Sequence, residues 1–293
     1  MISEVKTVLI NGNESLSVKE PTDEEFECFR KIVLKELGLS WNEDKKYLLY
    51  ARLQRRLHFL KFRTFSEYHE YLQIKDNDQE FQQLYNAVTT TKTGFYREKK
   101  HFEFLRDEIF PEMKEQMIRK RKKMRFWSAG CSCGEEPFNI AIEAHDFLGS
   151  KLTSGGGLRI LGSDVNTNVL DFAEKGQYTS DQVSNVPVEL RKRYFDSGNG
   201  LLKGNYLIKM EIRKLIQFRH FNLMSTEYPI ATKFQLIFCR NVLYYLNPEK
   251  REKLLSRLVS NLDDQGILVL GITESGYRVN GMEKLSYCIY RKK

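Results

Sequence analysis

Apolar residues in the first part of the chain recur at intervals of three and four, which is the spacing of one face of an α-helix. In the interval 23–37 the apolar side chains follow this spacing, and Gly38 ends it. The same pattern predicts four helices. The first covers 23–37, the second begins at 41–44, the third covers 67–74 and the fourth covers 80–88. Because no strand pattern precedes about residue 124, we expect a small helical domain here.

The second part of the chain shows short apolar runs that alternate with helical patterns. The runs are 125–129, 158–162, 234–239, 266–271 and 287–290, and the helical patterns are 135–148, 168–174 and 248–262. This alternation predicts a parallel-rich sheet covered by helices on both faces. Two further runs, 206–210 and 215–218, are typical of paired strands, so a small antiparallel insertion is expected there.

Composition and charge narrow the class of protein. The chain has 293 residues, 41% of them hydrophobic, which is enough for a sizeable core and excludes wholesale disorder. It carries 47 Lys and Arg against 39 Asp and Glu, a net charge of +8. This excess favours an acidic partner, which at this point could be nucleic acid, a phosphorylated ligand or an acidic protein surface.

The sequence also bears on compartment and metal binding. No apolar run approaches the roughly 18 residues of a membrane-spanning helix, and the polar start is not typical of a signal peptide. The five cysteines are scattered, as in proteins of a reducing cytosol. Cys131 and Cys133 are one residue apart, which is not the spacing of a zinc pair, so no metal site is expected.

The stretch from Trp127 to Pro137 carries the clearest chemical signal. A strand ends, a loop of small residues turns, and a helix opens with Glu135 and Glu136. The loop lacks the dinucleotide glycine pattern and a Walker lysine, and two acids would repel a pyrophosphate. They suit a ligand with a cationic group and ribose hydroxyls, such as S-adenosylmethionine. The alternative is a tight turn whose acids complement the helix dipole.

Asp164 ends the next predicted strand. In doubly wound sheets an acid at this place commonly accepts hydrogen bonds from ribose hydroxyls. The alternative is that Asp164 caps the following helix. Its position one strand after the small-residue loop favours the ligand interpretation.

Seven stretches, taken in order, resemble the bacterial chemoreceptor methyltransferases of the CheR type, which methylate receptor glutamates. The ordered set is specific, above all Gly-Glu-Glu-Pro at 134–137 and Phe-Cys-Arg-Asn-Val at 238–242. The stretches are 50–57, 91–98 with His101 and Phe102, 127–137, 162–164, 221–223, 237–245 and 271–275.

The resemblance implies a fold and a domain plan. The fold is α/β, a class I S-adenosylmethionine-dependent methyltransferase with a Rossmann-like mixed sheet. It is joined to a small N-terminal all-helical domain and carries a small antiparallel β insertion. The expected bounds are 15–92 for the helical domain, 93–123 for a linker and connecting helix, and 124–293 for the methyltransferase domain, with the insertion at about 196–220.

The resemblance also implies roles for residues. Arg97 would pair with the cofactor carboxylate, Glu135 with its ammonium group, and Asp164 with the ribose. The other implied cofactor contacts are Thr91, Thr93 from the linker, Asn222 and Leu223 at the adenine edge, and Arg240 and Asn241 beneath the methionine part, with Tyr245 near the methyl group. Thr91 and Cys133 depart from the family, where Asn and Thr are usual, and Phe138-Asn139 replaces Tyr-Ser.

The implied chemistry asks little of the protein. A glutamate carboxylate has a pKa of about 4.3 and is ionised at pH 7, so methyl transfer needs neither a general base nor a metal. Alignment of the reacting atoms at about 3 Å then supplies much of the rate, with Tyr245 and Arg240 as orienting residues. The basic face of the second helix, Arg52, Arg55, Arg56 and Lys61, would dock acidic receptor helices; the alternative is an ordinary solvated face.

Two other classes of protein share parts of this pattern. A nucleic-acid methyltransferase would suit the positive charge, but its Asn/Asp-Pro-Pro-aromatic motif is replaced by Arg240–Leu243, and Cys239 follows Phe238 rather than Pro. A non-catalytic module that senses S-adenosylmethionine is the other class, and the intact set of Arg97, Glu135 and Asp164 argues against a decayed pocket. We expect a monomeric cytoplasmic enzyme that membrane receptor arrays could recruit, without membrane insertion or a nucleic-acid partner.

Overall fold

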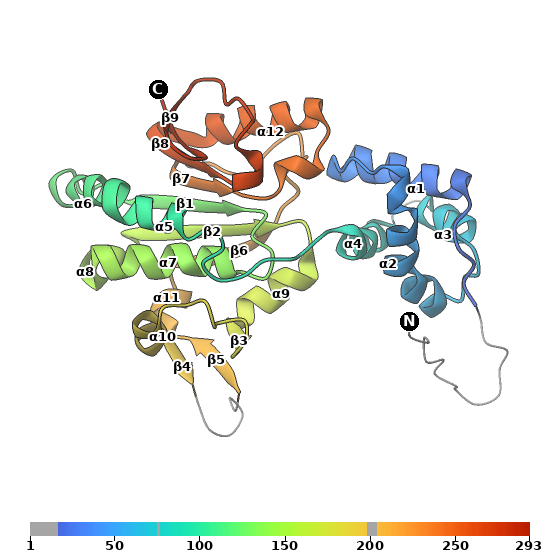
Figure 1. The fold of residues 1–293 in the computed structure, drawn as a ribbon, viewed down its shortest axis with the longest axis horizontal. Coiled ribbons are helices and arrows are strands. Elements are labelled where there is room, and N and C mark those ends of the chain that lie inside the picture. The colour runs from blue at the N-terminus through green and yellow to red at the C-terminus, as the bar shows by residue number, and fades with distance from the viewer. Residues whose placement is uncertain (1–16, 75–76, 198–203) are drawn as a thin grey trace. The chain divides into compact units, whose positions relative to one another are not determined.

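The computed structural model describes residues 17–74, 77–197 and 204–293. These residues form two compact units (Figure 1). The first unit comprises the described residues up to Lys35 and Trp41–Val88, and the second comprises Glu36–Ser40 and Thr89–Lys293. Parts of the expected helical domain and β insertion, 15–16 and 198–203, lie outside the described residues.

The first unit is helical, as its apolar spacing predicts. Its core contains Phe29, Leu49, Leu53 and Tyr68, all fully buried. The helix α3 begins with a cap, since the Thr64 side chain accepts from the third residue of the helix in a capping box. The elements are α1 (Asp23–Leu37), η1 (Glu43–Lys45), α2 (Lys46–Phe59), α3 (Phe65–Leu72) and α4 (Asp78–Val88).

The second unit is built on a seven-stranded sheet in the order β6-β2-β1-β7-β8-β10-β9. The first five strands run parallel, and β10 and β9 add an antiparallel edge. The strands are β1 (Met124–Ala129), β2 (Leu158–Asp164), β6 (Ile216–His220), β7 (Phe234–Cys239), β8 (Leu262–Leu270), β9 (Met282–Ser286) and β10 (Ile289–Lys292).

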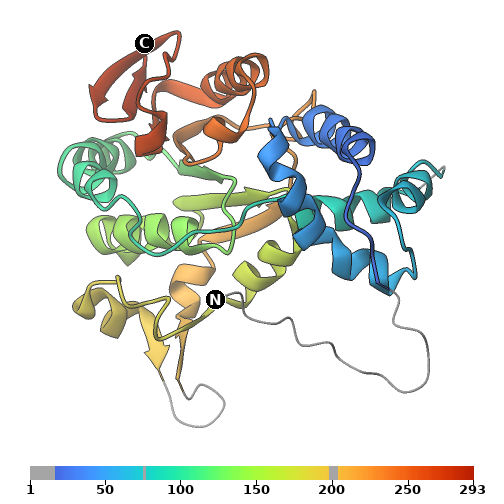
Figure 2. The same ribbon diagram turned by 45° about the vertical axis from the view of Figure 1, so that its right-hand side comes forward.

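Helices cover both faces of this sheet (Figures 1 and 2). Successive strand residues point to opposite faces, so Phe126 and Phe238 pack with α5, α6 and α7, while Trp127 and Cys239 pack with α12. The helices of this unit are α5 (Lys100–Phe104), α6 (Phe110–Arg119), α7 (Glu135–Leu148), α8 (Ser150–Thr153), α9 (Thr167–Lys175), α10 (Val188–Tyr194), α11 (Met210–Arg213) and α12 (Pro248–Asn261), with turns η2 (Leu105–Ile109), η4 (Leu243–Tyr245) and η5 (Ile272–Glu274).

A second, smaller sheet is antiparallel and has the order β3-β5-β4. It consists of β3 (Gln177–Thr179), β5 (Asn205–Ile208) and β4 (Phe195–Ser197). The predicted pairing of 206–210 with 215–218 is wrong, because the second run is β6 and pairs in parallel with β2. Phe218 explains the difference: its ring packs against Phe138 of α7, so this strand belongs to the main core.

The segment that precedes β1 is tied to α7 by polar contacts. The hydroxyl of Tyr96 donates to Glu143 at 2.7 Å, and Arg106 donates to Glu143 and to Asp146, both at 3.0 Å. These bonds make α5, η2 and α6 part of the second unit rather than a free connector. Among the described helices, none has the length and apolar character needed to cross a membrane.

A buried ion pair joins α2 to α4 inside the first unit. Glu80 is 3% exposed, accepts from Nε of Arg56 at 2.9 Å, and accepts from the hydroxyl of Tyr68 at 2.7 Å. A carboxylate buried to this degree depends on its partners, because water no longer solvates it.

Glu80→Gln is therefore expected to destabilise the first unit. The substitution keeps the shape of the side chain but leaves Arg56 without its counter-charge, which should lower the free energy of unfolding by about 2 kcal/mol because Arg56 is partly exposed. Urea unfolding followed by circular dichroism measures the change, with the exposed Glu70→Gln as control. Equal unfolding midpoints for the two variants would contradict the assigned role.

Candidate functional site

The loop after β1 is shaped by two glycines. Gly130 and Gly134 have φ angles of 78° and 91°, in the left-handed region that favours glycine. A Cβ at Gly130 would lie 2.8 Å from Cγ2 of Val242, and one at Gly134 would lie 2.7 Å from Cβ of Ala173. Conformation and space therefore both require glycine, and the loop backbone lies close to its neighbours.

Asp164, at the end of β2, binds this loop directly. One carboxylate oxygen accepts from the backbone N–H of Ser132 at 2.8 Å, and the other accepts from that of Asn166 at 2.9 Å. Burial raises the pKa of Asp164, and the amide hydrogen bonds oppose that increase. The hydroxyl of Ser132 donates to the carbonyl of Thr91 at 2.8 Å, which places the segment before β1 against the same loop.

Two adjacent glutamates begin α7, and their environments differ. Glu136 accepts from the hydroxyl of Ser128 at 2.6 Å and pairs with Nε of Arg240 at 2.7 Å. Glu135 is 3% exposed, and its Oε2 has no hydrogen-bond partner. Burial raises the pKa of Glu135 to about 7. An unpartnered buried carboxylate is costly, so a cation supplied by a ligand is the group that this position lacks.

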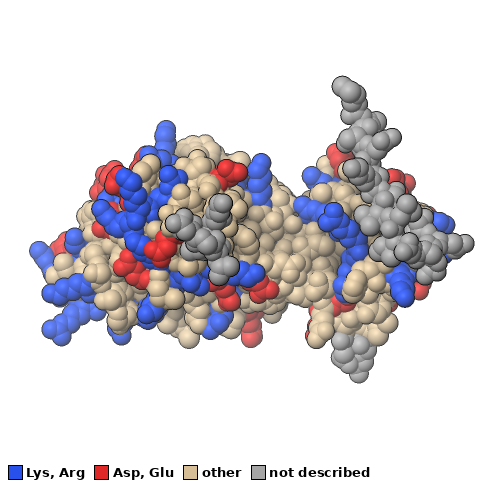
Figure 3. Space-filling view, turned by 90° about the horizontal axis from the view of Figure 1, so that it is seen from below, with Lys and Arg blue, Asp and Glu red and all other residues tan. Residues whose placement is uncertain are grey.

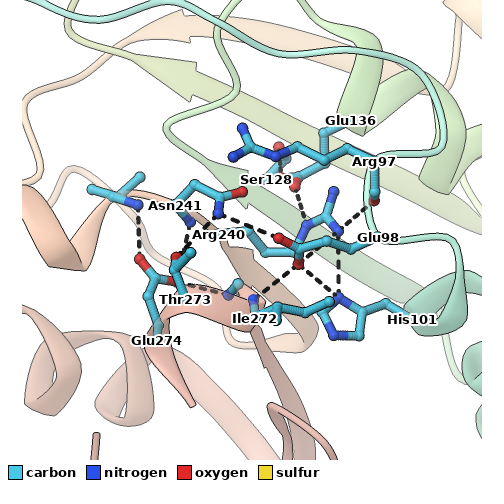
Figure 4. A network of polar contacts seen from close by, with 12 residues as sticks. Arg97, Glu98, His101, Ser128, Glu136, Arg240, Asn241, Ile272, Thr273 and Glu274 are labelled. Carbon is cyan, nitrogen blue, oxygen red and sulfur yellow. Dashed lines mark hydrogen bonds and ion pairs between the residues drawn. The ribbon is translucent and has the colours of Figure 1, made fainter. Parts of the chain in front are cut away.

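Arg240 follows β7 and is the centre of a buried polar network (Figure 4). Besides its bond to Glu136, its Nη1 donates to the carbonyl of Arg97 at 2.7 Å and lies 3.5 Å from the carboxylate of Glu98. The guanidinium thus joins the end of β7 to α7 and to the segment before α5. Sequence reasoning expected Arg240 beneath the cofactor; the structure gives its Nε and Nη1 protein partners.

Neutral and aromatic groups complete the surroundings of Arg240. His101 lies 3.3 Å from its Nη1, and burial and the Arg240 charge lower the pKa of His101 to about 4, so this histidine is neutral at pH 7. The rings of Phe102 and Phe238 lie 5.4 Å from the guanidinium carbon. The positive charge of Arg240 is therefore balanced by the carboxylates of Glu136 and Glu98 rather than screened by water.

Asn241 begins the loop that leads to Tyr245. Its φ is 60°, and its side-chain amide donates to Glu98 at 3.3 Å and to Oγ1 of Thr273 at 3.4 Å (Figure 4). Tyr245 is half-buried, and its ring centre lies 4.1 Å from that of Tyr244. The loop thus carries two predicted site residues, and the position of Asn241 depends on a neighbouring carboxylate.

Asn222 and Leu223 follow β6, next to Asp164. The backbone N–H of Phe221 donates to the carbonyl of Asp164 at 2.9 Å. The side-chain amide of Asn222 donates to the carbonyl of Glu36 at 2.8 Å and accepts from the N–H of Met224 at 2.9 Å. Both ends of this amide thus bind backbone groups of the second unit.

The predicted cofactor residues gather at one edge of the sheet. Because β1, β2, β6 and β7 run parallel, the loops after them meet where their carboxyl ends lie. Arg97 is half-buried there, and its Nη1 donates to the carbonyl of Lys92 at 3.2 Å. The residues at this edge are Thr91, Arg97, Glu135, Asp164, Asn222, Leu223, Arg240, Asn241 and Tyr245, and Thr93 follows Thr91 by two residues.

The predicted substrate-binding arginines lie on α2 in the first unit. Two have partners within that unit: Arg52 donates to the carbonyl of Val88, and Arg56 pairs with Glu80. Arg55 is exposed, and no ion pair involves it in the part of the chain that the structure describes. The basic face therefore combines internal and free charges, which the sequence pattern alone does not distinguish.

Three glutamates of the site were missed by sequence reasoning: Glu98, Glu136 and Glu274. All three lie in stretches that carry the family resemblance, which was the available signal. Glu136 follows the predicted Glu135, and nothing local distinguishes the carboxylate that pairs with Arg240 from the one that stays unpaired. Within residues 17–74, 77–197 and 204–293, no cluster of three His, Cys, Asp or Glu is arranged to hold a metal ion.

Both units match models of known protein families. Residues 91–289 match the family described as CheR methyltransferase, SAM binding domain, and residues 24–89 match CheR methyltransferase, all-alpha domain. With the mixed sheet and the loops at its carboxyl edge, this match defines the second unit as a class I S-adenosylmethionine-dependent methyltransferase, joined to an all-helical N-terminal domain. S-adenosylmethionine is its cofactor, and the unpaired Glu135 carboxylate fits a cationic ligand.

Curated relatives match most of the chain. The chain is 36% identical over 254 residues to chemotaxis protein methyltransferase 2 of Pseudomonas aeruginosa, covering 87% of each chain. It is 33% identical to the chemotaxis protein methyltransferase of Borreliella burgdorferi, covering 91% of this chain and 92% of that one. It is 31% identical to the chemotaxis protein methyltransferase of Escherichia coli, covering 92% of this chain and 89% of that one. The chain belongs to the CheR methyltransferase family.

The raised pKa of Glu135 makes stability depend on pH in a definite direction. The folded pKa is about 7 against an ordinary value of 4.5, so folding takes up a proton between these values. The native state therefore loses stability as pH rises from about 4.5 to 7. Glu135→Gln removes this loss of stability. The melting temperature of the variant, compared with that of the wild type, is therefore expected to be a few degrees more favourable at pH 8 than at pH 5.

Thermal unfolding of the cofactor-free protein at both pH values measures this effect. The exposed Glu174→Gln is the matched control, because it removes a carboxylate that is not buried. A Glu135→Gln effect that is the same at pH 5 and pH 8 would show that Glu135 is not a destabilised buried carboxylate.

Proposed function

We propose that this protein transfers the methyl group of S-adenosylmethionine to glutamate side chains of chemoreceptor cytoplasmic helices, forming glutamate methyl esters. The observation that carries the proposal is the buried Glu135 beside the glycine loop, whose Oε2 has no hydrogen-bond partner, in a chain whose curated relatives are named chemotaxis protein methyltransferases. The expected place of action is the cytoplasm, at receptor arrays, in chemotaxis adaptation.

The contacts of each residue refine its proposed role toward the cofactor. Glu135 would hold the ammonium group, Arg97 the carboxylate and Asp164 the ribose hydroxyls. The side-chain amide of Asn222 gives one N–H to Glu36 and accepts from Met224, so its second N–H remains for the adenine edge, which Asn222 and Leu223 would line. Thr91 and Thr93 would lie along the cofactor from the segment before α5.

Arg240 takes a different part in this proposal. Its Nε and Nη1 are engaged by Glu136 and by the carbonyl of Arg97. We therefore assign it a positioning role: it fixes the backbone of Arg97 and the start of the Asn241 loop. Asn241, which follows it, would form the floor beneath the methionine part of the cofactor.

The chemistry proposed for the site relies on placement rather than proton transfer. S-adenosylmethionine supplies a methyl group bound to a positively charged sulfur. A glutamate acceptor, with a pKa of about 4.3, is already ionised at pH 7, so the protein needs no general base. Tyr245 is proposed to orient the acceptor carboxylate, since it is half-buried at the end of the Asn241 loop. Such alignment supplies rate by reducing the entropy lost in the reaction.

The acceptor is proposed to dock on α2. Arg55 is exposed, and Tyr47 and Phe59 of the same helix are 75% and 73% exposed. A helix face with exposed aromatic rings and a free guanidinium suits an amphipathic helix that carries carboxylates. Arg52 and Arg56, although engaged within the unit, would add positive potential beside Arg55.

A nucleic-acid substrate is the second candidate, and the charge distribution does not favour it. On the face shown in Figure 3, Lys and Arg side chains lie among Asp and Glu side chains. Nucleic-acid methyltransferases need a basic surface that follows the phosphate backbone. The mixed charges on this face and the absence of the Asn/Asp-Pro-Pro-aromatic motif at Arg240–Leu243 support a protein acceptor instead.

The decisive assay supplies labelled S-adenosylmethionine together with a receptor cytoplasmic fragment or with RNA. The proposal predicts alkali-labile label on the receptor fragment, because a glutamate methyl ester hydrolyses in base. A fragment with its acceptor glutamates replaced by alanine is the control and should stay unlabelled. Label on RNA, or no transfer to the receptor, would overturn the proposal.

Cofactor affinity is expected to depend on the ionisation of Glu135. With a pKa of about 7 in the free protein, the ionised fraction rises about tenfold from pH 6 to pH 8. The affinity for S-adenosylhomocysteine should therefore rise about tenfold in this interval for the wild type. The affinity of Glu135→Gln for S-adenosylhomocysteine should be at least about tenfold weaker than that of the wild type at pH 8, and it should be nearly independent of pH.

Isothermal titration calorimetry at pH 6, 7 and 8 measures these affinities, and Glu174→Gln serves again as the control. A Glu135→Gln variant that binds S-adenosylhomocysteine as tightly as the wild type at pH 8 would rule out Glu135 as the ammonium site.

Arg55→Glu is expected to weaken acceptor binding without changing cofactor binding. Reversal of this exposed charge should raise the KM for the receptor fragment about tenfold at low salt, and less at high salt because surface charges are screened. Methylation kinetics at two ionic strengths measure this, and Lys31→Glu on the exposed face of α1 is the control. An unchanged KM, or a loss of S-adenosylhomocysteine affinity, would refute the assignment.

A further inference from the structure

Glu274 is a fully buried carboxylate that has no role in the function proposed so far. Its relative exposure is 0%, and it is the last residue of η5. Four backbone N–H groups donate to it: those of Gly271 at 2.6 Å, Leu243 at 2.7 Å, Val242 at 2.9 Å and Asn241 at 3.1 Å. One carboxylate thus binds two chain segments that are about 30 residues apart in sequence.

The four bonds determine the path of the loop after β7. Asn241 has a φ of 60°, and the next residues enter the short 3₁₀ turn η4, which ends at Tyr245. The first N–H groups of such a turn have no partner within it, and Glu274 accepts from them in the manner of a helix cap. The carboxylate therefore fixes the backbone from Asn241 to Leu243, and Tyr245 follows two residues later.

The packing around Gly271 shows how closely the two segments approach. A Cβ at Gly271 would lie 2.7 Å from Nδ2 of Asn241, 2.9 Å from its backbone nitrogen and 3.0 Å from Oε2 of Glu274. Its φ of −72° is available to any residue, so space alone excludes a larger side chain. Displacement of this contact would move the Asn241 loop directly.

Glu98 holds Asn241 from its other side (Figure 4). It accepts from the side-chain amide of Asn241 at 3.3 Å and from the backbone N–H of Ile272, in η5, at 3.1 Å. Asn241 is thus bound by Glu98 through its side chain and by Glu274 through its backbone. This double attachment leaves the loop little freedom.

A carboxylate is the group that suits the position of Glu274. All four neighbours are donors, and burial, which raises the pKa of Glu274, is opposed by hydrogen bonds from these same amides. A glutamine would keep one acceptor oxygen but would direct its own NH₂ donors at N–H groups. Two attractive contacts would become repulsive, and the loop would shift to relieve them.

We infer that Glu274 is a positioning residue for methyl transfer, whose carboxylate holds the 241–245 loop so that Asn241 meets the cofactor and Tyr245 meets the acceptor glutamate. This inference rests on the proposed function. It predicts that loss of Glu274 lowers turnover much more than it weakens the binding of cofactor or acceptor, since Glu135, Arg97 and Arg55, which are proposed to hold the charged groups of these ligands, lie on other elements.

The test compares wild type, Glu274→Gln, Gly271→Ala and the exposed control Glu283→Gln in receptor-fragment methylation. Glu274→Gln is expected to lower kcat at least about tenfold, with the receptor KM and the Kd for S-adenosylhomocysteine within about threefold of wild type. Each variant is measured well below its melting temperature. Gly271→Ala, which displaces Asn241 without removing the carboxylate, is expected to lower kcat in the same selective way, and Glu283→Gln to leave it unchanged.

The outcomes separate the inference from the proposed function. If the wild type forms no ester on the receptor fragment, the proposed function fails. If the wild type is active and Glu274→Gln retains its kcat, or loses kcat and binding equally, the positioning role is wrong. If Glu274→Gln does not fold, Gly271→Ala decides: a selective loss of kcat supports the inference, and an unchanged kcat overturns it.

Discussion

The buried pair between Glu136 and Arg240 is the interaction on which the rest of the site depends. It joins the first turn of α7 to the end of β7, and Arg240 extends the connection to the backbone of Arg97. Two carboxylates begin α7, and this guanidinium pairs with the second of them. The first of them, Glu135, keeps an unpartnered oxygen in a buried position. The Glu135 carboxylate is thus available to pair with a cationic ligand, and its burial lowers the stability of the cofactor-free protein.

The parallel sheet explains why one pair can have this effect. Parallel strands bring their carboxyl ends to a single edge, so the glycine loop, Asp164 and Asn241 meet there although they are far apart in sequence. Short polar links then determine their relative placement: Asp164 to the loop of Ser132, and Glu98 and Glu274 to Asn241. Most of these acceptors bind backbone N–H groups, so they fix the course of the chain as well as the positions of side chains.

Much of the fold could be predicted because its strongest signals are local. The bounds of α1, α7 and β7 follow from apolar spacing, a terminal glycine and a continuous apolar run, none of which needs knowledge of a partner. The pairing of β6 could not be predicted, because a period of two identifies a strand but not its neighbour. The edge strand β9 (Met282–Ser286) was missed since its residues, Met-Glu-Lys-Leu-Ser, do not alternate between apolar and polar and also suit an exposed loop.

The site shows the same division between local and distant information. Glu135 and Asp164 were candidates because strand ends and helix starts are places where ligands bind. The partner of Arg56 was hidden, since Glu80 lies 24 residues away and nothing local connects them. Glu274 was hidden for the same reason: its four donors come from segments that only the folded sheet brings together.

The most direct test of this account is a crystal structure of the protein with S-adenosylhomocysteine. The roles assigned to these residues predict that the ligand amino group lies within hydrogen-bond distance of the Glu135 carboxylate and that the pair between Glu136 and Arg240 remains intact. An amino group bound elsewhere, with Glu135 still unpartnered, or an Arg240 that leaves Glu136 to bind the ligand, would contradict them.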